Sequence, residues 1–225
     1  MDLKVKAALE SFFNTFSALE GVSSQKELNT LSDVFESDKD FMSKVEAMDE
    51  VFDSSPKLDA LREVTFDLLL TNFFAEDTKK LDEDYLESKE WEEIENQTMD
   101  RGTEVLNLLL YIKECEDEEI TPSLEDYLKE FLLVEEDEFQ DEHRIYEDII
   151  ANQILMDSDL KEIAKVSQKL SPDSEVKDIF YPLMGYFFNV NPNEAYIKEF
   201  KQLSEDAPYD TAILEMLLAY ATTKN

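Results

Sequence analysis

Apolar residues recur at every third or fourth position along most of the chain, which is the spacing that places them on one face of an α-helix. Between these positions the residues are mostly polar or charged, so each segment predicts an amphipathic helix. The four clearest apolar stripes are Val5, Leu9, Phe12, Phe13 and Phe16; Leu58, Leu61, Val64, Leu68 and Leu69; Phe139, Tyr146, Ile149, Ile150 and Ile154; and Val176, Ile179, Phe180, Leu183, Met184 and Phe187. The whole pattern predicts roughly twelve helices of ordinary length.

Several helix starts are marked by a proline that follows a residue able to cap free backbone amides. Proline suits the first helical position, and Ser, Thr or Asn just before it can accept a hydrogen bond from the first turn. Ser24 and Glu27 also have the spacing of a capping box. The proline-marked starts are Ser55-Pro56, Thr121-Pro122, Ser171-Pro172 and Asn191-Pro192.

The composition supports the helical interpretation. Of 225 residues, 43% are hydrophobic, while only 3 are glycine and 6 are proline. β-Sandwiches and barrels need more turn residues than this, and the apolar content is enough for a continuous core. We therefore predict a single all-α domain over residues 1–225, with its helices in antiparallel pairs.

Some of the predicted helices look duplicated at a spacing of about 70 residues, as in proteins built from helical repeats. DYLKEF at 126–131 resembles AYIKEF at 195–200, and EDIIA at 147–151 resembles EMLLA at 215–219. FDLLLTN at 66–72 suggests a third copy. Chance similarity between amphipathic helices is the alternative. If the duplication is real, we expect an α-solenoid-like array with sub-repeats at 24–96, 100–170 and 171–222.

Negative charge is abundant and unevenly distributed. The chain has 55 acidic and 21 basic residues, a net charge of −34. Residues 61–156 carry a net charge of −22, whereas the longer remainder carries only −12. Phosphate backbones and anionic membranes attract clustered Lys and Arg, so we expect no direct binding to nucleic acid or membrane. A basic protein is the partner that such a surface would attract.

Cysteine usage and hydropathy indicate a compartment. Cys115 is the single cysteine, so an intrachain disulfide or a thiolate metal cluster is not possible. Glu114 and Glu116 flank it and are expected to disfavour its thiolate. The N-terminal segment lacks a signal-peptide pattern, and the longest uncharged run is too short and too broken to span a bilayer. We expect a cytoplasmic protein.

The segment EEDEFQDEH, residues 135–143, carries six carboxylates and the single histidine. Di-iron bundles need Glu-x-x-His pairs, zinc sites need several His or Cys ligands, and an EF-hand needs a glycine at its sixth position. The segment fits none of these, so we expect no metal or cofactor. His143 falls on the stripe with Phe139 and Tyr146, where a half-buried histidine is expected. We expect the segment to run from an exposed loop into a helix start.

A short part of this region resembles a known motif. FQDEHRIYEDII, residues 139–150, is slightly similar to the Pro-x-Asp-His motif of chaperones of the TorD type, with Asp141 and His143 as the matching residues. Those proteins are all-helical and mature molybdenum-containing redox enzymes, so the resemblance implies a helical chaperone. The proline of the motif is missing here and Glu142 separates the pair, which puts the motif itself in doubt.

Patterns typical of enzymes are not found. The sequence has no Gly-x-Ser-x-Gly elbow, no phosphate-binding glycine loop and no Gly-x-Gly-x-x-Gly. We therefore predict a non-enzymatic acidic module that binds a basic protein surface, of the inhibitor or immunity type or as a mimic of nucleic acid. The predicted partner-binding residues are Glu116, Asp117, Glu118, Glu119, Glu135, Glu136, Asp137, Glu138, Asp141 and Glu142.

A second interpretation stays open beside the first. A helical-repeat scaffold or chaperone-like adaptor could bind a partner peptide in a groove lined by aromatic residues. Tyr181, Tyr186, Phe187 and Phe188 are the candidates for that lining. Binding through this groove would be insensitive to salt, whereas binding through the acidic residues would weaken as salt screens the charges.

Overall fold

The computed structural model describes residues 1–77, 80, 83–135, 138–139 and 145–224. Over these residues it contains thirteen α-helices, two 3-10 helices and one short antiparallel hairpin, which confirms the all-α prediction. The helices are α1 (Leu3–Glu20), α2 (Gln25–Glu36), α3 (Phe41–Asp53), η1 (Pro56–Leu61), α4 (Arg62–Glu76), α5 (Glu83–Leu86), α6 (Lys89–Thr98), α7 (Val105–Asp117), α8 (Leu124–Leu132), α9 (Glu147–Ala151), η3 (Gln153–Asp157), α10 (Leu160–Ser167), α11 (Phe180–Phe188), α12 (Glu194–Leu203) and α13 (Ala207–Thr222), and the strands are β1 (Leu133–Glu135) and β2 (Glu138–Phe139).

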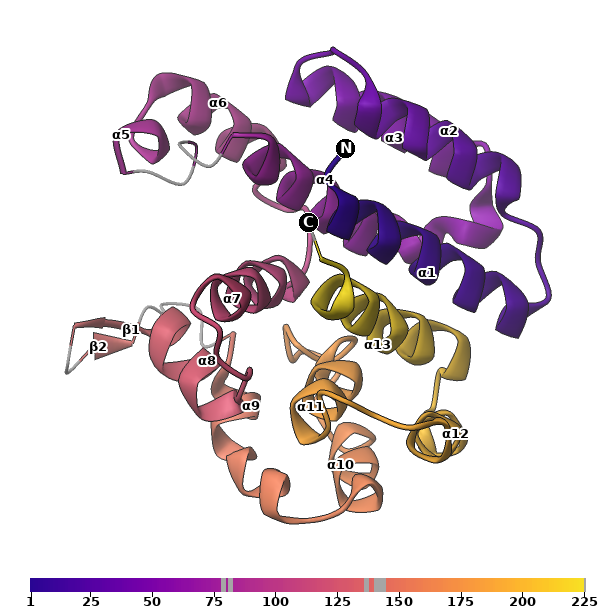
Figure 1. Ribbon diagram of the computed structural model, residues 1–225, viewed down its shortest axis with the longest axis vertical. Helices are drawn as coiled ribbons and strands as arrows, with labels where there is room; N and C mark the ends of the chain where they lie inside the picture. The colour runs from indigo at the N-terminus through magenta and orange to yellow at the C-terminus, as the bar shows by residue number, and fades with distance from the viewer. Residues whose placement is uncertain (78–79, 81–82, 136–137, 140–144, 225) are drawn as a thin grey trace.

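Helices α1 and α13, from opposite ends of the chain, pack side by side in the middle of the molecule (Figure 1). They run antiparallel: the Ser11 hydroxyl donates to the Glu215 carbonyl at 3.1 Å, and Lys4 Nζ lies 5.3 Å from the centre of the Tyr220 ring. In an α-solenoid each repeat contacts only its neighbours. Here the first and last helices form an extensive contact, so the solenoid arrangement is not confirmed.

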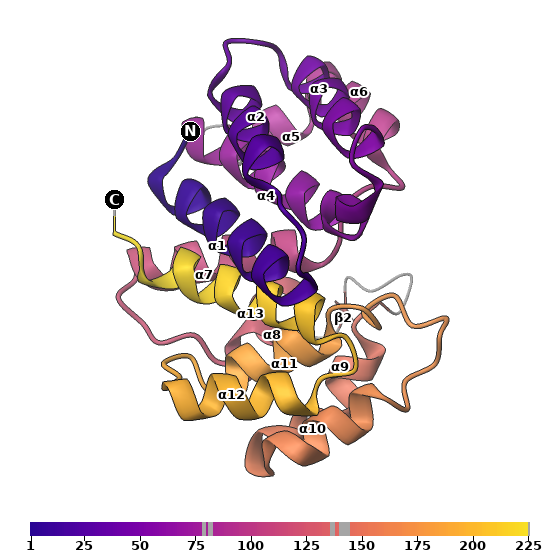
Figure 2. The ribbon, with the colours of Figure 1, turned by 90° about the vertical axis from the view of Figure 1, so that its right-hand side faces the viewer.

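The helices form an upper and a lower group around this central pair (Figure 2). The upper group is α2–α6, in which α4 packs against α1, α3 and α7. The lower group is α8–α12, in which α11 packs against α10 and α13. Buried apolar residues from α1 through α13 belong to one hydrophobic cluster. Burial of this cluster is the main stabilising contribution to the fold.

Three of the four predicted apolar stripes are buried as expected. The third stripe is wrong as a single helix. Phe139 lies in strand β2, α9 begins only at Glu147, and Ile154 in η3 is 71% exposed. A hairpin, a helix of five residues and a 3-10 helix follow one another here, so residues spaced by three or four positions do not share one face.

The first two predicted helix starts are correct in position. Ser55-Pro56 opens η1, and α2 begins directly after Ser24. However, the capping box does not form. The Ser24 hydroxyl is hydrogen-bonded to the Ser17 hydroxyl, and Glu27 accepts instead from the Ser55 hydroxyl at 3.1 Å. Contacts with Ser17 and Ser55, which lie outside α2, therefore take the place of the capping hydrogen bonds of Ser24 and Glu27.

The other three starts are displaced along the chain. Helices α8 and α12 each begin two residues after the proline, and Ser123 and Asn193 accept hydrogen bonds from their first-turn amides. Ser171-Pro172 opens a turn and not a helix, since α11 begins at Phe180. The predictions for α8 and α12 are wrong in detail because a polar residue closer to the helix provides the cap, whereas α11 has Ile179 at its N-cap and no side-chain cap.

The proposed duplication is not confirmed either. Residues 126–131 and 195–200 both lie in helices, α8 and α12. Residues 147–151 form the short helix α9, however, whereas residues 215–219 lie inside the sixteen-residue α13. Among the described residues no helix is long and apolar enough to cross a membrane.

Candidate functional site

The acidic residues 116–119 lie at the C-terminal end of α7. Glu116 accepts a hydrogen bond from Lys4, a fully buried residue of α1, and lies 3.7 Å from Lys113. Asp117 forms an ion pair with Lys113 at 2.5 Å. Glu118 and Glu119 follow and are exposed to solvent. Glu116 is therefore already used within the fold, whereas Asp117, Glu118 and Glu119 face outward.

A left-handed residue ends this helix. Glu119 has a φ of 58°, a conformation that glycine usually occupies. Its amide donates to the Glu116 carbonyl at 3.1 Å, and the Ile120 amide donates to the Cys115 carbonyl at 2.9 Å. These are the two hydrogen bonds of a Schellman motif. The motif turns the chain from α7 toward α8.

The second half of the predicted acidic surface is only partly described. Glu135 lies in β1 and Glu138 in β2, where the two residues are paired across the hairpin. The segment was expected to be a loop before a helix, so the strand at Glu135 is a correction. The remaining predicted residues, together with His143, lie outside the described residues: Glu136, Asp137, Asp141 and Glu142.

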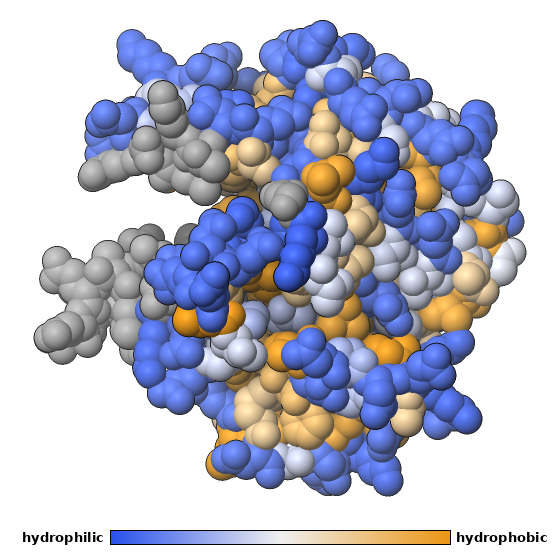
Figure 3. Space-filling view, viewed as in Figure 1, coloured by the Kyte–Doolittle hydropathy of each residue, from blue (hydrophilic) through white to orange (hydrophobic). Residues whose placement is uncertain are grey.

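Helix α8 lies between these two acidic segments in the chain and forms one wall of a groove. The opposite wall consists of α9 and η3, and the end of α11 closes the groove. Its volume is about 640 Å³, within the range of typical binding sites. The apolar lining residues are Pro122, Leu124, Leu128, Ile150, Met156, Phe187 and Phe188. Figure 3 shows apolar side chains gathered in the lower part of the face, where α8, η3 and α11 meet, with hydrophilic side chains around them.

Hydrogen bonds made by three tyrosines connect the walls of the groove to α7. The Tyr111 hydroxyl accepts from the Ser123 amide and donates to the Ser123 carbonyl, both at 3.1 Å. The Tyr127 and Tyr146 hydroxyls are 2.9 Å apart, and Tyr146 donates to Glu104. Burial raises the pKa of Tyr111, Tyr127 and Tyr146, so these phenols stay protonated and able to donate.

The charged residues around the groove are mainly acidic. Glu125 and Asp157 are on its rim, and Lys129 is the single basic residue among the described lining residues. Lys129 donates to Glu125 at 2.6 Å, so its charge is already paired. The groove therefore combines an apolar interior with a rim that attracts cations.

The aromatic cluster predicted from the sequence divides between core and groove. Tyr181 is buried against Phe200, with the rings stacked at 4.3 Å and its hydroxyl donating to the Phe200 carbonyl at 3.0 Å. Tyr186 is completely buried. Only Phe187 and Phe188 line the groove. The expectation that all four line one groove is wrong, because successive residues of a helix point in different directions.

The other side chains of the groove were not identified from the sequence. Leu124 and Leu128 recur at helical spacing in α8, which predicts only that they face something apolar. Ile150 lies in α9 and Met156 in η3, whereas the third predicted stripe was one helix that ended at Ile154. No sequence signal marks this region, because the exposure of Ile154 near it appears only in the structure.

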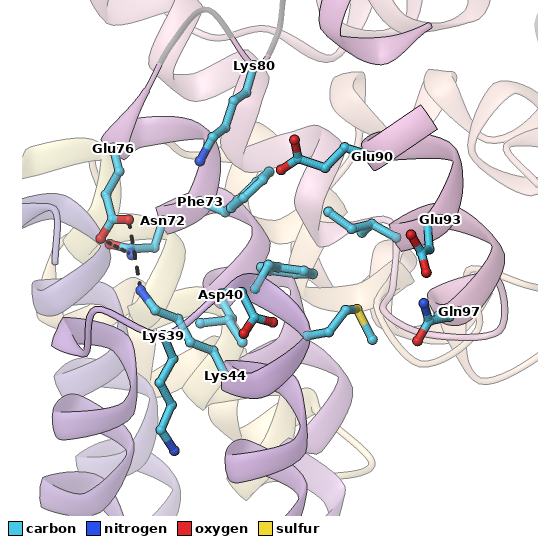
Figure 4. Close-up of a pocket in the computed structure, with 14 residues that line it drawn as sticks. Lys39, Asp40, Lys44, Asn72, Phe73, Glu76, Lys80, Glu90, Glu93 and Gln97 are labelled. Carbon is cyan, nitrogen blue, oxygen red and sulfur yellow. Dashed lines mark hydrogen bonds and ion pairs between the residues drawn. The ribbon is translucent and has the colours of Figure 1, made fainter. Parts of the chain in front are cut away.

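A second cavity, of about 470 Å³, lies between α3, α4 and α6 (Figure 4). Figure 4 shows Lys44 directed toward Glu76 and Asn72. Lys44 lies 3.9 Å from Glu76, and the Asn72 amide donates to Glu76 at 2.9 Å. The ammonium of Lys80 lies 3.6 Å from the centre of the Phe73 ring, a cation–π contact.

Charges of both signs surround this second cavity. Glu90 and Glu93 approach from α6, opposite the lysines (Figure 4). Asp40 accepts hydrogen bonds from the amide and hydroxyl of Ser43 and caps α3. Lys44, Asn72 and Glu76 are engaged with one another, and the other charges are of both signs, so the described lining does not select one class of ligand. The groove between α8 and α11 is the stronger candidate.

Cys115 is buried in α7, and burial is the main reason that the pKa of its thiol is raised. The carboxylates of Glu114 and Glu118 add to this effect. A disfavoured thiolate was predicted from the sequence, but only from the charges of the neighbouring carboxylates and not from burial. Over the described residues, no group of three or more His, Cys, Asp or Glu side chains is arranged to hold a metal ion.

Comparisons of the chain with protein-family models, with curated proteins and with solved structures gave no match.

Proposed function

We propose that this protein is a non-enzymatic interaction protein that binds a basic surface on another protein. The observation that carries the proposal is the net charge of −22 within residues 61–156, against −12 for the rest of the chain. Solubility alone does not require such concentration, and the repulsion between the carboxylates costs stability. An inhibitor or immunity protein, or a mimic of nucleic acid, would present a surface of this kind.

The exposed acids at the end of α7 support this proposal. Asp117, Glu118 and Glu119 lie next to each other at a helix C-terminus, where the helix dipole is itself negative. Negative charge here destabilises the helix slightly, so helix stability does not explain it. A long-range field from such a surface accelerates the approach of a basic protein.

A second candidate function is that of an adaptor that takes a partner's peptide. The groove between α8 and α11 favours it, because its interior is apolar and its walls come from four separate elements. The two functions are compatible, since the groove and the acidic residues are neighbours along the chain.

The test is affinity capture from a native lysate at low salt, followed by measurement of association rates with the purified captured protein. The test variant changes Glu118, Glu119, Glu135 and Glu138 to glutamine. We expect association about tenfold slower for this variant at low salt, and a difference that shrinks as salt rises.

A matched control removes four charges from α1, α2 and the connection between α2 and α3, outside the predicted acidic surface. The exposed residues Glu10 and Glu36 are changed to glutamine, and Asp33 and Asp38 to asparagine. If the acidic region is the binding surface, this control associates at nearly the rate of the unchanged protein. Equal effects of the two variants would show that only the total charge matters, and the proposal would be rejected.

A further inference from the structure

We infer that the groove between α8 and α11 binds an amphipathic, lysine- or arginine-rich helix of the partner protein. This inference rests on the proposed function and adds the chemistry of the element that is recognised. The partner's apolar side chains would enter the groove, and its cationic side chains would lie over the acidic rim.

The interior of the groove requires an apolar ligand. Its apolar lining includes Leu124 and Leu128 from α8, Ile150 from α9, Met156 from η3 and Phe188 from α11. Met156 and Phe188 are only half-buried in the free protein, so covering them would remove further apolar area from water. Methionine also adapts its shape to different apolar partners.

Two apolar side chains close to the groove along the chain are exposed. Ile154, next to the lining residue Gln153, is 71% exposed, and Ile120, two residues before the lining residue Pro122, is 47% exposed. Exposed apolar side chains are common at protein–protein contacts.

The rim determines the charge of the occupant. Glu125 and Asp157 are the acids among the described lining residues, and Glu125 is paired with Lys129, so the lining carries a net charge of −1 from Asp157. Glu118 and Glu119 add negative charge a few residues before α8. Cations that flank an apolar helix face would therefore be attracted on both sides of the groove.

A second copy of this chain is a poor occupant. Two molecules that each carry a net charge of −34 repel each other. A small anionic ligand is equally disfavoured, because the basic residue of the described lining is already paired. A cationic amphipathic helix from another protein satisfies both the apolar interior and the acidic rim, which is the helix-in-groove mode of recognition.

The test uses two synthetic peptides of about 14 residues, each roughly 21 Å long as a helix, made only of leucine and lysine. In the first peptide the leucines recur at helical spacing and form one apolar face. The second has the same composition in an order that spreads the leucines around the helix. Their net charges are identical, so a difference in affinity reports the apolar face.

We expect the amphipathic peptide to bind at least about tenfold more tightly than the scrambled peptide, as measured by fluorescence anisotropy. The variant Met156→Lys places a cation in the groove and should abolish this preference. Gln202→Lys, on the exposed side of α12, makes the same change of net charge and should keep it. Should Met156→Lys alter the circular dichroism spectrum, Ile150→Ala is the second variant, and it should reduce the preference at least about threefold.

Two results would overturn the inference. Equal affinity for the two peptides would mean that the acidic surface binds by charge alone. A preference that persists unchanged in Met156→Lys and Ile150→Ala would place the peptide somewhere other than the groove. Either result leaves the proposed function standing, because that function fails only when the glutamine variant and its matched control bind the basic protein equally.

Discussion

At the scale of single residues, the clearest departure from ordinary chemistry is a buried carboxyl group. Asp210, near the start of α13, is buried and accepts a hydrogen bond from the Ser204 hydroxyl at 2.5 Å. Its pKa is raised to about 7, mainly by burial and also by the carboxylates of Asp206 and Asp178, while the hydrogen bond from Ser204 opposes the shift. The group is therefore half-protonated near neutral pH.

This shift predicts a pH dependence of stability. Between pH 4 and pH 7 the folded state keeps a proton on Asp210 that the unfolded state releases. The free energy of unfolding should therefore fall as the pH rises through this range, by up to about 4 kcal/mol from this group, and level off above it. The variant Asp210→Asn should match the unchanged protein near pH 4 and be more stable near pH 7.5 in urea denaturation. A constant stability difference across this range would contradict the assignment.

At the scale of helices, α7 ends in a left-handed residue that is not the usual glycine. Helices often end with a left-handed glycine, as α1 does at Gly21, where φ is 73°. Helix α7 forms the same type of termination with Glu119, whose side chain strains the left-handed conformation. The residue type gave no indication of the turn, which is set by the packing of α7 and α8 through Tyr111 and Ser123.

Replacing this residue tests the cost of the left-handed conformation. Glu119→Gly should raise the free energy of unfolding by about 1 kcal/mol, because glycine adopts the conformation without strain. Part of the gain could come from removing a negative charge at the helix C-terminus. Glu119→Gln measures that part alone, and Glu118→Gly, at a residue with φ of −89°, should be destabilising. Equal stability of Glu119→Gly and Glu119→Gln in urea would contradict the strain argument.

At the scale of the whole molecule, local ion pairs oppose a large overall repulsion. Arg101 contacts Asp49 at 3.0 Å and Glu63 at 3.0 Å, and so attaches the segment between α6 and α7 to α3 and α4. Arg62 binds Asp49 and Asp53 nearby. Such pairs offset only part of a net charge of −34.

The balance between these effects predicts the influence of salt. Screening weakens long-range repulsion and exposed ion pairs together, but the repulsion involves many more charges. We expect the free energy of unfolding to rise by the order of 1 kcal/mol or more between about 0.02 M and about 0.5 M sodium chloride, with urea as the uncharged denaturant. A smaller rise is expected for the variant that loses the four charges at Glu118, Glu119, Glu135 and Glu138. A fall in stability with salt would show that the local ion pairs dominate.

The class of fold and much of the core could be predicted from local features of the sequence. Few glycines and prolines, together with apolar residues at helical spacing, predict helices, and the stripe from Val5 to Phe16 is buried as expected. These features are local, because one helical turn decides which residues share a face. The exposure of Glu118 and Glu119 was predictable for the same reason, since charged residues at a helix end stay in water.

The ends of the helices and the contacts between them depend on packing between residues far apart in the sequence, and they are known only from the structure. Helix α13 packs against α1, Ser24 bonds to Ser17 instead of capping α2, and Phe139, Ile149 and Ile154 lie in three separate elements and not in one helix. The groove likewise depends on α8, η3 and α11 coming together from separate parts of the chain. Periodicity reports that a face is apolar but not which partner covers it, because that partner is chosen by packing between residues far apart in the sequence. The concentration of acidic residues could be predicted from the chain, whereas the rim acids Glu125 and Asp157 and the apolar groove beside them could not.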